Sequence, residues 1–308
     1  MKRRKSIVIW RFIDGKPGHE NQTQGLVQAL AHHCNPRVID IRPLSAIRAI
    51  FAWLFSYYPN PESHPRPDLI LGAGHATHLS MLAARRAFGG RAIVLMKPSL
   101  PMRFFDLCII PEHDGVRPGK NVLLSEGVLN RMEPGTEKDP HKGLILLGGP
   151  SAHYGWDEKH LLQQIAEVIR QDPRAWIVAT SRRTPESILS RLRHALPPEV
   201  DVVPHEQTTA DWLPQQLSEA GVIWITEDSV SMVYEALSSG AACGLFPVPR
   251  KGETRITRGI DRLLQRGLLT AYEQWRETGL YVQSGHHFNE AARIAAWMCK
   301  SWDNVGSP

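Results

Sequence analysis

Residues 221–248, GVIWITEDSVSMVYEALSSGAACGLFPV, place a polar turn between two apolar runs. Residues 222–225 are typical of a buried strand, residues 232–237 have helical spacing and stop before Gly240, and a second buried strand follows. A helix that begins directly after a strand leaves the N–H groups of its first turn without helical partners. In an open α/β sheet, this strand end is where nucleotides bind.

Strands and helices alternate along the whole chain. Strands are expected at residues 6–13, 37–41, 68–71, 92–96, 142–147, 176–180 and 200–203, and helices at 22–32, 44–55, 77–87, 157–171, 185–196, 257–266 and 288–302. This alternation predicts an α/β protein with mostly parallel sheets. The polar segment 130–141 is expected to link two Rossmann-like domains, 1–135 and 136–308, that face an interdomain cleft. An alternative for the final helix is that it packs back on the first domain.

Composition indicates a folded protein without a membrane span. The chain has 308 residues, of which 42% are hydrophobic and 22% charged, and a net charge of +5. The basic residues are too dispersed to predict nucleic-acid binding. The four cysteines are far apart, which favours reduced thiols over a metal site. We therefore expect a cytoplasmic protein, with peripheral contact on the inner face of the membrane as an open alternative.

Two loops of the first domain are candidates for holding an acceptor. The loop DGKPGHENQTQG, residues 14–25, combines glycines that permit a tight turn with His19, whose ordinary pKa suits a general base. A plain structural role for His19 at the helix start is the alternative. The acceptor-side residues are expected to be Asp14, Gly15, Gly18, Asn21, Gln22, Gly74, His75 and Lys97. His75 and His78 have no evident third ligand for a metal, so contact with substrate is favoured there.

Three loops of the second domain are candidates for holding a nucleotide diphosphate. Gly148 and Gly149 follow a strand and are expected to offer N–H groups to a phosphate, with Ser151 adding a hydroxyl. The segment TSRRTP, residues 180–185, contains two arginines, whose guanidinium groups suit a diphosphate. The alternative is that either arginine is an ordinary surface residue. The predicted donor-binding residues are Gly148, Gly149, Ser151, Ser181, Arg182, Arg183, Thr226, Glu227, Asp228, Ser229, Ser231, Met232 and Glu235.

Two carboxylates near the start of the helix at 232–237 have different predicted roles. Glu235 lies one turn into the helix, where a carboxylate can accept hydrogen bonds from the two hydroxyls of a ribose. Asp228 has the simple alternative of capping the helix. The helix at 44–55, LSAIRAIFAWLF, is favoured as a buried core helix, and a peripheral membrane contact is its alternative.

The loops together resemble those of the GT-B glycosyltransferases, in particular the enzymes that add N-acetylglucosamine to lipid I. The segments Pro17-Gly18-His19 and 234–240 are similar to motifs of that family. The resemblance implies that Glu235 binds the donor ribose, that Gly148, Gly149 and Ser151 bind the diphosphate, and that His19 lies at the reaction centre. Lys16-Pro17 and Gly240-Ala241-Ala242 depart from the pattern.

Almost the whole chain resembles the mitochondrial fission factors named for elongated mitochondria. The strings DGKPGHENQ at 14–22, LGGPSAHYGWD at 147–157, TSRRTP at 180–185 and TEDSVSMVYEA at 226–236 are similar to signatures of that family. Its plant members are regarded as fission adaptors, and it has many bacterial members. This resemblance implies the same fold and leaves the chemistry open.

The expected function is transfer of a sugar from a nucleotide-diphosphate sugar to an unknown acceptor, with a lipid-linked acceptor as one option. His19 would deprotonate the acceptor, while Arg182 or Arg183 and the helix start near Ser229 stabilise the leaving diphosphate. No DxD sequence stands at a strand end, so neither a metal nor another cofactor is expected. A membrane-recruited adaptor without catalysis and a nucleotide-sugar epimerase are the alternatives.

Overall fold

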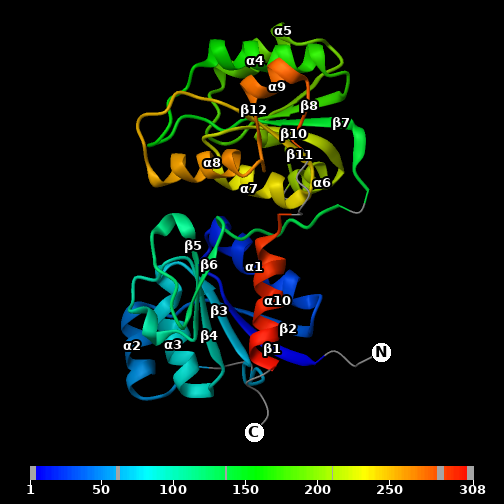
Figure 1. Ribbon diagram of the computed structural model, residues 1–308. Coiled ribbons are helices and arrows are strands. Elements are labelled where there is room, and N and C mark those ends of the chain that lie inside the picture. The colour runs from blue at the N-terminus through cyan, green and yellow to red at the C-terminus, as the bar shows by residue number, and fades with distance from the viewer. Residues whose placement is uncertain (1–4, 60–62, 136, 210, 283–287, 304–308) are drawn as a thin grey trace. The chain divides into compact units, whose positions relative to one another are not determined.

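The computed structural model describes residues 5–59, 63–135, 137–209, 211–282 and 288–303 (Figure 1). The chain divides into two compact units. Unit 1 consists of residues 1–131 together with 290–308, and unit 2 consists of residues 132–289. Each unit contains a six-stranded sheet covered by helices. The expected fold class, an α/β protein with two parallel sheets, is confirmed.

The sheet of unit 1 is parallel throughout and has the strand order β2-β1-β3-β4-β5-β6. Its strands are β1 (Ser6–Phe12), β2 (Asn35–Ile41), β3 (Leu69–Ala73), β4 (Arg91–Leu95), β5 (Leu107–Pro111) and β6 (Val122–Ser125). Sequence patterns did not reveal β5 and β6, because both are short and no α-helix separates either from the strand before it. Successive side chains such as Ile9 and Trp10 enter different cores, so both faces of the sheet are buried.

Helices cover both faces of this sheet. They are α1 (Pro17–Ala31), α2 (Ala46–Leu54), α3 (His75–Phe88) and α10 (Glu290–Asp303), with short 3-10 helices η1 (Met102–Phe104) and η2 (Glu112–Asp114). The C-terminal helix α10 lies beside α1, and Ile294 shares a core with Leu26 (Figure 1). Helix α1 begins at Pro17, five residues before the predicted start at Gln22, because proline is favoured in the first turn of a helix.

The sheet of unit 2 has the order β12-β11-β10-β7-β8-β9 and is also parallel. The strands are β7 (Asp139–Leu146), β8 (Ala175–Ala179), β9 (Asp201–Val203), β10 (Ala220–Thr226), β11 (Ala242–Phe246) and β12 (Thr270–Ala271). The helices are α4 (Glu158–Gln171), α5 (Ser187–Ala195), η3 (His205–Gln207), α6 (Trp212–Glu219), α7 (Val230–Ser239), α8 (Arg255–Gln265) and α9 (Tyr272–Thr278). Residues 139–141, predicted as linker, instead begin β7, where Asp139 pairs with Ala220.

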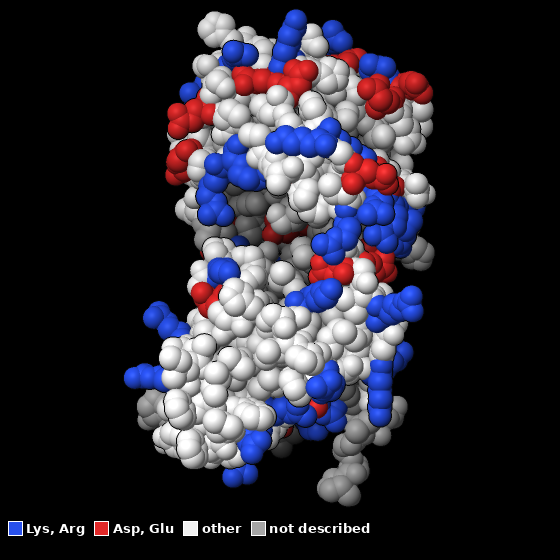
Figure 2. Space-filling view, turned by 90° about the vertical axis from the view of Figure 1, so that its left-hand side faces the viewer, with Lys and Arg blue, Asp and Glu red and all other residues white. Residues whose placement is uncertain are grey.

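Helix α2 differs from the favoured prediction of a buried core helix. Only its two alanines Ala49 and Ala52 are buried, whereas its large apolar side chains are exposed. Figure 2 looks onto this side of the molecule and shows a broad uncharged area in unit 1. The apolar composition misled the prediction, because it does not reveal which residues face the sheet. No helix in the described part of the chain is long and apolar enough to cross a membrane.

Glycines opposite tryptophans make the unit 2 core possible. Gly143 lies directly beside Trp176 on the next strand, and Gly244 lies beside Trp224. A Cβ atom on Gly244 would lie 2.5 Å from the Trp224 ring, and one on Gly143 would lie 2.4 Å from the Trp176 ring. Trp224 is fully buried and stacks on Phe246 with ring centroids 4.6 Å apart. The absent side chains therefore leave the space that the indoles fill.

Replacing Gly244 with alanine is expected to destabilise unit 2 by about 1–3 kcal/mol, because the added methyl overpacks the site against a ring that cannot move. Gly259→Ala is the matched control, because Gly259 lies within α8 and no atom would come within 4 Å of its Cβ. That substitution should stabilise the protein by up to about 1 kcal/mol through helix propensity. Denaturant unfolding of both variants measures the difference, and equal effects would contradict the packing argument.

Candidate functional site

The strand order of unit 2 creates a switch point between β7 and β10. The chain builds β8 and β9 on one side of β7, and then β10, β11 and β12 on the other. The loops that leave β7 and β10 therefore diverge at the carboxyl edge of the sheet, which is the usual ligand-binding position in such sheets. These loops contain the predicted donor-binding residues 148–151 and 226–229.

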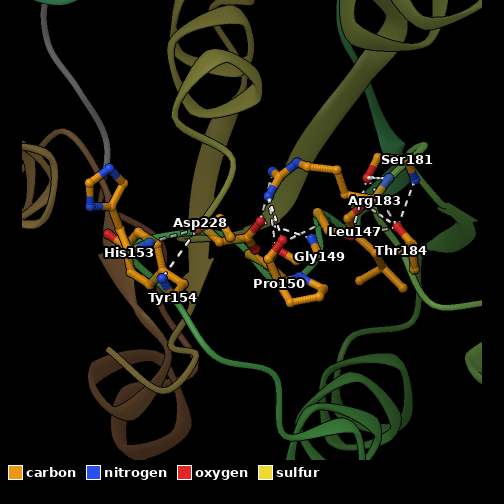
Figure 3. Close-up of polar contacts among 12 residues, drawn as sticks. Leu147, Gly149, Pro150, His153, Tyr154, Ser181, Arg183, Thr184 and Asp228 are labelled. Atoms are coloured by element: carbon orange, nitrogen blue, oxygen red, sulfur yellow. Dashed lines mark hydrogen bonds and ion pairs between the residues drawn. The ribbon is translucent and has the colours of Figure 1, made fainter. Parts of the chain in front are cut away.

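Asp228 ties the two loops together (Figure 3). Its Oδ2 accepts a hydrogen bond of 2.8 Å from the backbone N–H of Gly149 and forms an ion pair of 2.9 Å with Nη2 of Arg183. Arg183 also donates through Nη1 to the carbonyl oxygen of Gly149 at 2.8 Å. In the same way, the N–H of Gly148 donates to Oγ1 of Thr226 at 2.8 Å. The strand ends are thus fixed by side chains from the neighbouring loops.

The two glycines have a different role from the predicted one. Their N–H groups already have acceptors inside the protein, so in this structure they are not open to a phosphate. A Cβ on Gly148 would lie 2.2 Å from Oδ2 of Asp228, and one on Gly149 would lie 2.0 Å from the carbonyl oxygen of Arg183. Only glycine permits these approaches. The N–H groups were expected to face a phosphate, whereas in this structure they face groups of the protein itself.

Asp228 is not the cap of α7. The N-cap residue is Ser229, whose side chain makes no capping hydrogen bond. The Asp228 side chain is fully buried, and its Oδ1 has no hydrogen-bond partner among the described residues. Burial raises the pKa of Asp228, while the Gly149 N–H and the Arg183 guanidinium act in the opposite direction. The carboxylate therefore has a structural function at the switch point.

Several other predicted donor residues are also engaged within unit 2. Oγ of Ser151 accepts from the N–H groups of His153 and Tyr154, and Oγ of Ser181 donates to the carbonyl oxygen of Gly148 at 3.1 Å. Glu227 is buried, accepts from the N–H of Val248 and pairs with Arg250 at 2.6 Å. These contacts order the loops and leave fewer groups for a ligand.

The groups that remain open favour an anion. Arg182 is exposed and makes no hydrogen bond or ion pair with any described residue. The first turn of α7 offers N–H groups that have no helical acceptor and are not capped by Ser229. A helix N-terminus attracts negative charge through its dipole. Ser231 is exposed in the same turn, and Met232 and Glu235 are half-buried on α7.

Unit 1 has its own switch point between β1 and β3, and His19 lies there. Its Nδ1 is 2.9 Å from Oδ2 of Asp14, whose side chain is 3% exposed. An ionised carboxylate only accepts hydrogen bonds, so this contact places the proton on Nδ1 and leaves Nε2 as an acceptor. The ring packs against Gly74, which has a φ of +81° and where a Cβ would lie 2.3 Å from Cε1 of His19. The pairing of Asp14 with His19 was not foreseen from the sequence.

The other residues predicted for the acceptor side differ in their exposure and contacts. Gln22 is buried and donates to the carbonyl oxygen of Gly18 and to the sulfur of Met96. Lys97 and His75 are exposed, Asn21 is half-buried, and the N–H of Gly15 donates to Glu20. Met96 has a φ of +70°, which a residue with a side chain rarely adopts. The one-dimensional pattern contained no signal for that conformation.

The two histidines of α3 diverge. His75 is exposed, whereas His78 is buried, with its Nδ1 3.1 Å from Oγ of Ser99 and its ring edge-on to Phe105. Within the ranges that the structure describes, no cluster of three potential metal ligands is found. Burial, followed by the neighbouring His75 and His19, lowers the pKa of His78 to about 4. His78 is therefore neutral at neutral pH.

The buried neutral His78 predicts a loss of stability in acid. The unfolded chain binds a proton at this residue below its ordinary pKa of 6.5, but the folded protein does so only near pH 4. Stability from this group is thus present above pH 6.5 and is lost as the pH falls toward 4, by about 2 kcal/mol between pH 7 and pH 5. Urea unfolding of His78→Gln should show a correspondingly smaller change. The exposed His33→Gln is the control, and an unaltered pH dependence in His78→Gln would refute the assignment.

Comparisons with known proteins agree with this architecture. Residues 17–302 match the family described as Mitochondrial fission ELM1. The Rickettsia prowazekii (strain Madrid E) protein RP120, described as uncharacterized, is 21% identical over 93% of this chain and 96% of its own length.

Solved structures share the fold at low identity. A putative UDP-N-acetylglucosamine 2-epimerase from Listeria monocytogenes is 11% identical with a TM-score of 0.59, covering 98% of each chain. A UDP-GlcNAc 2-epimerase from Neisseria meningitidis, bound to UDP-GlcNAc, is 9% identical with a TM-score of 0.58, covering 97% of this chain and 100% of its own. MurG from Acinetobacter baumannii is 12% identical with a TM-score of 0.52, covering 96% and 99%. The fold is therefore GT-B glycosyltransferase-like, and the chain belongs to the Mitochondrial fission ELM1 family.

Proposed function

We propose that this protein binds a nucleotide-diphosphate sugar at the carboxyl edge of the unit 2 sheet and transfers the sugar to a lipid-linked acceptor held at the carboxyl edge of the unit 1 sheet. It would act from the cytoplasmic side at a membrane surface. The GT-B-like fold supports the general kind of function, because the solved relatives named above are UDP-GlcNAc epimerases and a MurG. The particular reaction rests on the residues at the two edges.

The observation that carries the proposal is an exposed arginine together with an uncapped helix start at the carboxyl edge of the unit 2 sheet. Arg182 has an exposed guanidinium without a partner in the described chain, and the uncapped start of α7 lies in the same group of loops. The buried Asp228 and the more exposed Arg183 hold these loops in place without occupying those groups. A diphosphate has the charge and the acceptor oxygens to satisfy both the guanidinium and the helix N–H groups.

The remaining donor contacts follow from the position of α7. Ser229 and Ser231 can donate hydroxyl hydrogen bonds to phosphate oxygens. Glu235 lies one helical turn further along, and we assign it the ribose hydroxyls. The Neisseria meningitidis epimerase was solved with UDP-GlcNAc bound, so uridine nucleotides are the first donors to test.

In the proposed reaction His19 is the general base. Its Nε2 would take the proton of the acceptor hydroxyl while the Asp14 carboxylate stabilises the resulting imidazolium. The acceptor oxygen then forms a bond to the anomeric carbon as the bond from that carbon to the diphosphate oxygen breaks. Arg182 and the α7 N-terminus would receive the charge that develops on the leaving diphosphate. We expect the reaction to need no cofactor.

An epimerase is the second candidate, because two of the three solved structures described above are named as UDP-GlcNAc 2-epimerases. Both reactions begin with the same nucleotide sugar. Incubation of UDP-GlcNAc without an acceptor separates them, since an epimerase forms a new sugar isomer that is visible by NMR and a transferase does not. A protein that binds no nucleotide of any base would instead be an adaptor.

Calorimetric titration with uridine, guanosine, adenosine, thymidine and cytidine diphosphates tests donor binding. We expect one base to bind and Arg182→Gln to weaken that binding about 10- to 100-fold, the loss of a charged hydrogen bond worth roughly 1.5–3 kcal/mol. Arg170→Gln is the matched control, because Arg170 is also exposed but lies in the last turn of α4, away from this edge. Equal weakening by both substitutions would remove Arg182 from the site.

His19→Gln tests the base once an acceptor supports turnover. Nucleotide affinity should be unchanged, whereas kcat should fall about 10²- to 10⁴-fold, the usual contribution of a positioned base. In Asp14→Asn we expect a smaller decrease in kcat and a shift in the pH profile, because the carboxylate acts through the imidazole. Normal turnover in His19→Gln would show that another group takes the proton.

A further inference from the structure

Helix α2 buries its small residues and exposes its large apolar ones. Its small residues Ala49 and Ala52 face inward, and Ala52 shares a core with Ala83 and Ala84 of α3. Its large apolar residues face outward, with Phe51 56% exposed and Phe55, which follows the helix, 75% exposed. A helix of a water-soluble domain normally places its large apolar residues against the core. A contiguous exposed apolar surface of this kind marks an interaction site.

A pocket of about 550 Å³ opens on the same surface. Its apolar wall is formed by α2, α3 and the η1 segment, including Trp53, Leu82, Leu100 and Phe104. Exposed aromatic residues thus surround a concave apolar site. This combination suits an apolar chain that enters from a surface better than it suits a flat protein partner.

Basic side chains predominate around the pocket. Residues 42–58, 75–91 and 97–105, which form the surface, contain seven Lys or Arg and no Asp or Glu. The guanidinium of Arg86 lies 4.8 Å from the ring centroid of Trp53, and that of Arg103 lies 5.2 Å from that of Phe104. Neither arginine has a carboxylate partner within the described ranges. Arg85, by contrast, pairs with Asp106 at 2.8 Å. The surface is therefore cationic as well as apolar (Figure 2).

We propose that α2, the pocket and η1 dock on a lipid bilayer that contains anionic phospholipids, with an acyl chain in the pocket. Large apolar side chains on one helix face, together with Trp and Tyr, suit the boundary between headgroups and acyl chains. The unopposed arginines supply the attraction to anionic headgroups. A second copy of this cationic surface would meet it with like charges, which argues against self-association.

The position of the pocket indicates which class of acceptor the protein would use. Leu79 and Leu100 line it, and they directly follow His78 and Ser99, which contact each other at the acceptor edge. A bilayer on this surface places lipid headgroups beside that edge. The acceptor of the reaction is then a hydroxyl or phosphate carried on a membrane lipid. This step rests on the proposed function, whereas the docking itself does not depend on catalysis.

Vesicle flotation of the full chain tests the docking. Binding to vesicles of phosphatidylcholine with phosphatidylglycerol should be about tenfold or more stronger than to phosphatidylcholine alone, and should weaken with added salt. Phe51→Glu combined with Phe55→Glu should reduce it at least about tenfold. Leu280→Glu is the matched control, because Leu280 is a 70% exposed apolar residue of unit 2.

Arg48→Glu should weaken binding to the anionic vesicles, whereas the exposed Arg193→Glu should not.

Hydrogen exchange on anionic vesicles should protect the amides of residues 46–58 and leave those of α5 unchanged. Nucleotide titration of the same variants separates the two proposals, because the phenylalanine substitutions should not alter nucleotide affinity. Three results would overturn the docking: no vesicle binding, equal binding in the Phe51→Glu, Phe55→Glu variant, or a dimer in solution that this variant dissociates. None of these results bears on donor binding at unit 2.

Discussion

The buried carboxylate of Asp228 is the contact on which the loops at the carboxyl edge of the unit 2 sheet depend. It joins the loop after β10 to the loops after β7 and β8 through the Gly149 N–H and the Arg183 guanidinium. Removing a carboxylate from water is costly, and the cost is offset only when its partners are held in place. Here the partners are held because Gly148 and Gly149 have no side chains to push the loops apart. These contacts connect the loop that contains Arg182 to the loop that precedes α7.

The fold was predictable from the sequence because alternating strands and helices fix the class almost alone. The strand and helix of 221–248 are found as β10 and α7, and the strand that follows is β11. Short elements such as β6 were not predicted, because four residues are too few to show a periodic pattern. Helix α2 was misjudged for a different reason. Apolar content predicts burial only on average, and the orientation of a helix depends on what its neighbours can accept.

The site was predictable as a set of loops but not as a set of contacts. Residue types and strand ends identified Gly148, Gly149, Arg183 and Asp228 as neighbours, because parallel strands bring their carboxyl ends to one edge. Which groups would satisfy one another could not be predicted from spacing, because it depends on distances of a few tenths of an ångström. The same limit concealed the contact between Asp14 and His19, whose geometry depends on the first turn of α1 and on Gly74.

Unit 1 contains a sheet that is buried on both faces and a helix, α2, whose large apolar side chains are exposed. Its sheet is buried on both faces and needs no further cover, so the exposed side of α2 adds nothing to the core. Helix α2 is buried only through Ala49 and Ala52, and Ala52 shares a core with the small residues Ala83 and Ala84 of α3. The packing of α2 on α3 therefore fixes the apolar face outward. The proposed docking on a bilayer would remove that face from water without any change in the fold.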